Sequence, residues 1–251
     1  LLEPELTPHN GRIWLRLRVS DGIGGRQYLV KSIPQFLDAI EQGESVSYGK
    51  SLAFVHRWDA FAPDAQPLLR LLRRQVSARQ AFEAEGTMRS GWEKGPAGGL
   101  PLTGEGLDAL VELYAAEGVV GGYTLKEGLP VISLKVERRK GGVQLSCTPV
   151  LSGVQGLDYA YLLGETTLWR MQREECRRVL PVLETFGGRS LFFTSADAAA
   201  FCSYVLPELG NRVNIVDPDR LLLNQIPLEP VVQFYLDAPD NTRIEAHAEF
   251  L

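Results

Sequence analysis

The sequence predicts an α+β fold with mixed sheets, in which an antiparallel meander and hairpins combine with local strand–helix–strand units, and it leaves room for two lobes. Two observations carry this prediction. Short runs that alternate apolar and polar residues, as half-buried strands do, recur along the chain, and amphipathic helices with recognisable ends stand between several of them. No repeat of fixed period is evident beyond this alternation.

Residues 1–86 are predicted to form an N-terminal lobe of a hairpin, a short helix, a strand and a long helix. RIWLRLRV alternates apolar and basic residues like a strand, and SDGIGG turns it toward RQYLV. A helix is expected next, because Ser32 can cap its N-terminus, Pro34 suits the first turn and Gly43 suits the position after the last turn. The run at 62–86 predicts the longer helix, ending at Gly86.

The segment GESVSYGKSLAF (43–54) contains Gly49-Lys50-Ser51, the tail of a phosphate-binding loop. Such a loop needs G-x-x-x-x-G-K-[ST] between a strand and a helix, but Glu44 occupies the position of the first glycine and a helix precedes the segment. The apolar residues of VSYGKSLAF alternate. We therefore predict one strand, with Lys50 at a sheet edge or Gly49 in a bulge.

Residues 87–105 are predicted to be a linker or loop, because this part of the chain is dense in Gly and Pro and has little periodicity. Residues 106–251 are predicted to form a larger α+β lobe. It begins with a helix, continues through strands joined in part by the hairpin signal RRKGG, and ends in a strand pair at its C-terminus. The strands and helices of 166–216 predict right-handed crossover units.

The bulk composition is that of a globular protein, with 45% hydrophobic residues and a net charge of −5. This charge gives no global attraction to nucleic acid, so any such contact must come from local patches. Three widely spaced cysteines predict reduced thiols in a cytoplasmic protein. The sequence contains no run of about 20 uncharged residues, so no membrane-spanning helix is predicted. The chain does not begin with Met, and we expect it to be a piece of a longer protein.

No residue pattern predicts a catalytic, cofactor-binding or metal site. The histidines are isolated, without a partner at metal-ligand spacing: His9, His56 and His247. Glu174 and Glu175 are adjacent in a predicted helix, so they point to different sides and cannot form an acid–base pair. No G-x-S-x-G motif and no glycine-rich turn for a dinucleotide appear. We therefore expect a chain that is not itself an enzyme.

Three groups of basic residues are the candidate nucleic-acid contacts. One group shares a face of the helix at 62–86, another lies at the tip of the RRKGG hairpin, and the third is predicted to share a helix face near residue 173. Such side chains could contact phosphates. They could equally form a solvated face balanced by neighbouring glutamates. The nine residues are Arg70, Arg73, Arg74, Arg138, Arg139, Lys140, Arg170, Arg173 and Arg177.

Three stretches together resemble the accessory region that precedes the motor in bacterial Swi/Snf-type helicase-like ATPases. They are YLVKSIPQFLDAIEQGESVSYGKSLAF, with its Pro-started helix leading to Gly-Lys, FTSADAAAFCSYVLPELG, with its Leu-Pro terminus, and PVVQFYLDAPDNTRIEAHAEF, with its Phe-Tyr-Leu-Asp strand. Their order and spacing fit the family over roughly residues 28–250, so the predicted lobes together would make one helicase-associated region.

This resemblance implies a non-catalytic accessory domain of a cytoplasmic, DNA-dependent ATPase or translocase, which packs on the motor that follows it or regulates that motor. The ATP-binding and hydrolase functions would belong to the parent protein, because the Walker motifs are absent from this chain. The expected partners are the ATPase lobes of the same polypeptide and, as a candidate, double-stranded DNA, with no membrane. The resemblance carries over no functional residue. The alternative is a free-standing protein- or ligand-binding module with no link to a motor.

Overall fold

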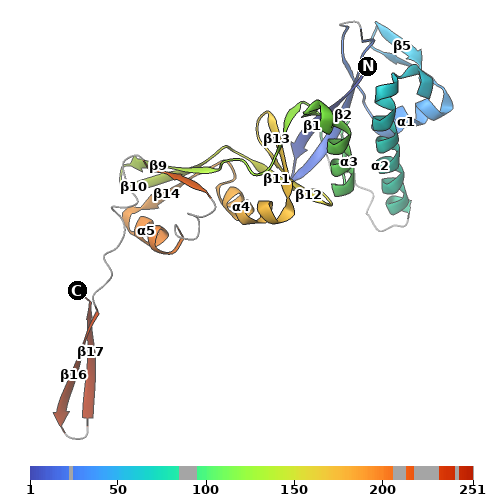
Figure 1. Cartoon of the computed structure of the whole chain (residues 1–251). Helices are drawn as coiled ribbons and strands as arrows, with labels where there is room; N and C mark the ends of the chain where they lie inside the picture. The colour runs from blue at the N-terminus through green and yellow to red at the C-terminus, as the bar shows by residue number, and fades with distance from the viewer. Residues whose placement is uncertain (23–24, 85–94, 206–212, 218–231, 241–242, 251) are drawn as a thin grey trace. The chain divides into compact units, whose positions relative to one another are not determined.

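The computed structural model describes residues 1–22, 25–84, 95–205, 213–217, 232–240 and 243–250. Its residues fall into two compact units (Figure 1). The first unit contains Leu1–Pro130 and Pro149–Gly187, and the second contains Val131–Thr148 and Gly188–Leu251. The fold is α+β, as the sequence predicts, because helices combine with antiparallel and mixed sheets. No described helix is long and apolar enough to cross a membrane.

The first sheet of the first unit is built around β2 (Arg12–Val19), the strand that RIWLRLRV predicts. β1 (Leu2–His9) pairs with β2 antiparallel along its whole length, and β3 (Tyr28–Leu29) continues the sheet. The expected β2–β3 pairing is therefore confirmed, whereas the main partner β1 was not predicted. β6 (Leu100–Pro101) also pairs with β2.

Three helices pack with this sheet in one hydrophobic core. α1 (Ile33–Gln42) begins and ends as predicted, because Ser32 Oγ accepts from the Gln35 N–H and Gly43 ends the helix at φ 67°. A 3₁₀ turn (Pro63–Ala65) leads into α2 (Gln66–Ala84), whose predicted end at Gly86 lies outside the described residues. α3 (Gly104–Tyr114) is followed by a 3₁₀ turn (Ala115–Glu117).

The Gly-Lys-Ser segment forms a tight hairpin, so the prediction of one continuous strand was wrong. β4 (Ser45–Tyr48) and β5 (Leu52–Val55) pair antiparallel, and the tripeptide is the turn between them. Gly49 has φ 60°, a left-handed conformation that glycine adopts without strain. Because a reversed chain also brings alternate apolar residues to one side, the periodicity could not reveal the turn. A 3₁₀ turn (Trp58–Ala60) follows.

The second sheet of the first unit has the strand order β11-β12-β13-β8-β7. These strands are β7 (Val119–Val120), β8 (Tyr123–Glu127), β11 (Ser152–Gln155), β12 (Tyr159–Leu163) and β13 (Thr167–Gln172). β13 and β8 are parallel, and the other pairs are antiparallel. α4 (Arg173–Phe186) contains Pro181, and Gly187 caps its C-terminus.

The predicted linker at 87–105 does not separate the two units. Residues 85–94 lie outside the description, but β6 follows them directly in the first sheet, and α3 packs on α2. Gly95 lets the chain pass close to this sheet, because a Cβ there would lie 2.3 Å from the ring of the buried Trp14. The segments before and after the predicted linker therefore share one core.

The second unit contains a four-stranded mixed sheet with the order β14-β10-β9-β15. β9 (Ser133–Arg139) and β10 (Gly142–Thr148) form the predicted hairpin. β14 (Ser190–Thr194) and β15 (Asn214–Val216) run parallel to each other, with α5 (Ser195–Ala200) and a π-helical turn (Phe201–Val205) between them in the chain. This is one of the predicted strand–helix–strand units, but β13 is not part of this sheet. The predicted C-terminal pair is present as β16 (Val232–Asp240) and β17 (Arg243–Phe250).

Candidate functional site

Two of the three arginines on the predicted basic face of α2, Arg73 and Arg74, form ion pairs within the first unit. Arg73 bridges to α1, with its guanidinium nitrogens 3.2 Å from Asp38 Oδ1 and 2.6 Å from Glu41 Oε2. Arg74 lies 3.6 Å from Glu105 Oε1 of α3. Arg70 is exposed and has no acidic partner among the described residues. Two of the three arginines therefore connect helices.

Arg170, Arg173 and Arg177 do not share a helix face, because Arg170 lies in β13, before α4 begins. Its guanidinium is mostly buried, pairs at 2.9 Å with both Glu112 and Glu127, and lies over the Tyr159 ring. The hydrogen bonds from Arg170 to Glu127, and further pairing with Glu112, raise the pKa of Arg170. This residue fixes β13 to α3 and β8.

The other two arginines of this group lie in α4, Arg173 as its first residue and Arg177 one turn later. Arg173 donates to the Leu157 carbonyl at 3.1 Å, and its buried Nε has no hydrogen-bond partner in the described part of the chain. Arg177 is exposed, 3.9 Å from Glu174 Oε1. Glu175 accepts from the Gln172 N–H and caps the helix, so the adjacent glutamates have separate contacts, as expected.

The third basic group lies at the β9–β10 tip of the second unit. Arg139 is held by Glu137 at 2.7 Å and donates to Gln144 at 2.6 Å. Hydrogen bonding from Lys135, together with the nearby positive charges, lowers the pKa of the Glu137 carboxyl. Arg138 and Lys140 are exposed and have no acidic partner among the described residues. They are therefore the hairpin cations that could contact phosphates without first breaking an ion pair with a described residue.

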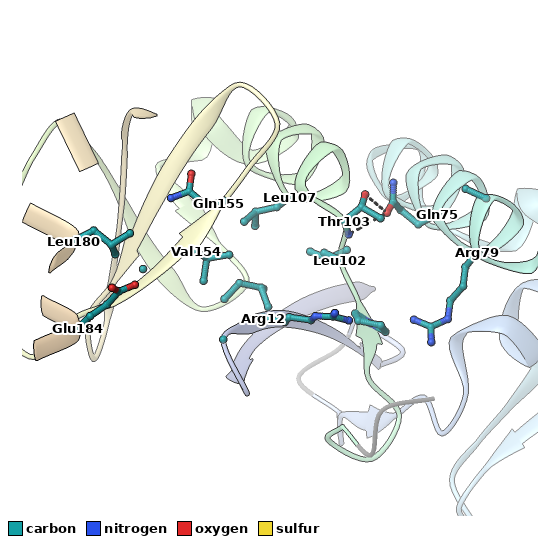
Figure 2. A pocket seen from close by; sticks show the side chains of 15 residues that line it. Arg12, Gln75, Arg79, Leu102, Thr103, Leu107, Val154, Gln155, Leu180 and Glu184 are labelled. Carbon is teal, nitrogen blue, oxygen red and sulfur yellow. Dashed lines mark hydrogen bonds between the residues drawn. The ribbon is translucent and has the colours of Figure 1, made fainter. Parts of the chain in front are cut away.

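A cavity of about 520 Å³ lies in the first unit, on elements that the sequence analysis did not connect (Figure 2). Residues from the start of β2, from α2, from the segment between β6 and α3, from β11 and from α4 line it. Its apolar lining includes Ile13, Leu102, Leu107, Val154 and Leu180. This size and composition are typical of sites that bind small molecules or peptide side chains.

A buried polar contact fixes the wall formed by α2 and α3. Thr103 caps α3 by accepting from the Gly106 N–H, and its hydroxyl donates to Gln75 Oε1 at 2.8 Å (Figure 2). Gln75 is only 6% exposed. A Cβ at position 106 would lie 2.5 Å from the Gln75 side chain, so glycine is needed for this approach.

Three charged side chains line the cavity, and two of them are cationic. Arg12 and Arg79 lie toward one side of it in Figure 2, and Glu184 lies beside Leu180 on the other. Both arginines also take part in other interactions of the chain. None of these three residues was singled out from the sequence, because β2, α2 and α4 are far apart along the chain.

Another cavity in the first unit, of about 590 Å³, is lined by α1, β3 and the β4–β5 hairpin, including Tyr28, Tyr48 and His56. His56 is fully buried among aromatic rings, 2.7 Å from Tyr48 Oη and 3.3 Å from the Phe54 carbonyl. Burial lowers the pKa of His56. This histidine is a core residue. Among the described residues, no group of three or more His, Cys, Asp or Glu side chains could hold a metal ion.

The family described as bacterial SNF2 helicase associated matches residues 109–251. The chain belongs to this family. The match begins within α3 and covers the second sheet and α4 of the first unit, together with the whole second unit. Comparison with curated proteins and with solved structures found no match. The resemblance seen in the sequence is thus confirmed at the level of a helicase-associated accessory region.

Proposed function

We propose that this chain is a non-catalytic accessory region of a bacterial Swi/Snf-type DNA-dependent ATPase, and that it packs on the motor lobes of the same polypeptide and regulates them. The match to the SNF2 helicase-associated family over more than half of the chain carries this proposal. Arg73 and Arg170, two of the predicted nucleic-acid contacts, instead hold helices and strands of the first unit together, which is a structural role.

The test compares the full-length parent protein with a variant that lacks the region corresponding to this chain. DNA-stimulated ATP turnover and DNA affinity are measured for both over a range of salt concentrations. We expect the deletion to change turnover, affinity or both, while the motor still hydrolyses ATP. Equal turnover and equal affinity would contradict the regulatory role.

For contact with double-stranded DNA, we propose Arg138 and Lys140 as the leading candidates among the nine basic residues. Both are exposed at a hairpin tip and have no acidic partner in the described part of the chain. Charge reversal of both in the full-length protein should weaken DNA binding and reduce the salt slope by about 2, since each phosphate contact contributes about 1.

The matched control is Lys31→Glu/Lys50→Glu, which reverses two exposed cations elsewhere on the chain and changes the net charge by the same amount. We expect this variant to bind DNA like the wild type. If the Arg138→Glu/Lys140→Glu variant keeps the wild-type affinity and salt slope, these two residues do not contact DNA.

A further inference from the structure

We propose that the open face of the sheet β14-β10-β9-β15 binds single-stranded DNA, with a base stacked on Phe192 and phosphates at the tip of the β9–β10 hairpin. This inference rests on the proposed DNA contact of Arg138 and Lys140, and it adds the form of the DNA and an aromatic contact. The surface lies in the part of the chain that the family matches, and the family description assigns no ligand to it.

One face of this sheet is covered by a helix. α5 packs on β14 and β10 (Figure 1). Phe193 of β14 contacts Phe201 in the turn that follows α5, with the ring centroids 5.0 Å apart. The strand residues on this face include the buried side chains Leu134, Val136, Val143, Leu145 and Cys147. This face is therefore the core of the sheet.

The opposite face, which we call the open face, is polar. It consists of the odd-numbered residues of β9 and the even-numbered residues of β10, β14 and β15, because side chains alternate along a strand. None of these residues is buried. Their side chains include Lys135, Glu137, Arg139, Gln144, Ser146 and Phe192. A sheet with a helix behind it and an aromatic ring on its free face can hold the bases of a single strand.

Phe192 is the aromatic contact on the open face. Its side chain is 54% exposed, whereas the adjacent Phe193 points to the covered face. The Phe192 ring reaches the neighbouring strand, where a Cβ at Gly142 would lie 2.9 Å from Phe192 Cζ. Glycine at position 142 therefore leaves room for the ring. An exposed ring on a sheet is a platform on which any base can stack.

Positive charge is in excess around this sheet. The described residues of the sheet and its helix (131–148, 188–205 and 213–217) contain five cations and three carboxylates, although the whole chain has a net charge of −5. Lys135 and Arg139 share Glu137, at 2.7 Å each. Arg138 and Lys140 are exposed at the hairpin tip and have no acidic partner in the described ranges. Phosphates would complement these two cations.

The combination of a ring and unpaired cations favours a single strand over a duplex. In a duplex the bases stack on one another, so a protein ring reaches them only after a base step has been unstacked, which costs energy. In a single strand the bases are free to stack on the protein while the phosphates follow a positively charged surface.

The experiment measures DNA binding by the 251-residue chain from fluorescence anisotropy over a range of salt concentrations. The first probe is a labelled oligothymidylate, which has bases but forms no duplex. An abasic strand of the same length has the same phosphates without bases, and a labelled duplex is the third probe. We expect the oligothymidylate to bind about ten times more tightly than the abasic strand, as one stacked base would allow.

Variants of Phe192 test the stacking contact. Phe192→Ala should weaken binding of the oligothymidylate about tenfold and leave binding of the abasic strand and the duplex within about twofold. Phe192→Tyr keeps a ring and should bind like the wild type. The matched control is Tyr204→Ala, which removes another exposed ring of the second unit and should also bind like the wild type.

The phosphate contacts are tested separately. Arg138→Glu/Lys140→Glu should weaken binding of both single strands and reduce the salt slope by about 1.4, since each phosphate contact of a single strand contributes about 0.7. Phe192→Ala should leave this slope unchanged. The proposal is wrong if the oligothymidylate and the abasic strand bind equally, or if Phe192→Ala binds like Tyr204→Ala. If only the charge variant weakens binding, the phosphate contacts stand and the stacked base is refuted; if neither does, both are refuted.

Discussion

Replacing Tyr161 by Phe removes one hydroxyl from the contact that joins α3 to the second sheet of the first unit. Tyr161 is fully buried and donates to Asp108 Oδ1 at 2.6 Å, and Asp108 also accepts from the Asp158 N–H. A hydrogen bond to a charged group contributes about 1.5–3 kcal/mol, and phenylalanine leaves almost no cavity. Because one donor to Asp108 remains, we expect a loss of about 2 kcal/mol.

The assay is urea and thermal unfolding of the 251-residue chain at pH 7. For a unit of this size, about 2 kcal/mol corresponds to a decrease in Tm of about 4–8 °C. Tyr159→Phe is the matched control in the same strand, because the Tyr159 hydroxyl makes no hydrogen bond among the described residues; we expect a change within about 0.5 kcal/mol. Asp108→Asn completes a double-mutant cycle.

The pH dependence gives an independent readout of the same contact. Burial, and then the hydrogen bond and charge of Asp108, raise the pKa of Tyr161. The folded chain keeps a phenol proton that the unfolded chain releases above about pH 10, so the stabilisation is complete below that pH and declines as the pH rises. Tyr161→Phe should therefore lose less stability than the wild type between pH 9 and pH 11. This reasoning would be refuted if Tyr161→Phe were as stable as the wild type at pH 7. It would also be refuted if the changes in the free energy of unfolding caused by Tyr161→Phe and Asp108→Asn were additive in the double variant.

Two further predictions concern the N-terminal part of the first unit. Arg73→Glu should lower the free energy of unfolding by about 1–2 kcal/mol, because it removes two ion pairs with α1 and places like charges together. The control Arg70→Glu should change the free energy of unfolding by less than about 0.5 kcal/mol. Equal urea midpoints for the two variants would contradict the bridging role of Arg73. His56 should make the chain less stable in acid. Burial lowers the pKa of His56 in the folded chain, so its imidazole takes up a proton in the unfolded chain at a higher pH than in the folded chain. The stability that is present above about pH 6.5 is therefore lost as the pH falls. His56→Phe should reduce the difference between the urea midpoints at pH 7.5 and pH 5, and an unchanged difference would assign the acid sensitivity to other groups.

Local chemistry explains which parts of the fold could be predicted. Ser32 and Gly43 mark the ends of α1, and Gly187 marks the end of α4, because caps and left-handed glycines act within a few residues. The β9–β10 hairpin follows in the same way from its turn. The β4–β5 turn was missed because alternation alone does not distinguish a straight strand from a reversed one.

The candidate sites show the limit of such local patterns. The spacing of Arg70, Arg73 and Arg74 placed them correctly on α2, but their acidic partners come from α1 and α3. Arg170 was grouped with the arginines of α4 although it lies in β13, because a charge pattern in the sequence can continue across the boundary between a strand and a helix.

The sequence by itself determined the α+β class, the ends of α1, the absence of a phosphate-binding loop at 43–54 and the family resemblance, since each depends on residues that are neighbours along the chain. Only the tertiary structure decided that 106–130 shares a core with residues 1–84, that most of the predicted basic residues are paired, and that Arg12, Arg79 and β11 surround one cavity. The physical reason is that burial and charge pairing depend on distances in space, which strand pairing and helix packing set between segments far apart in the chain.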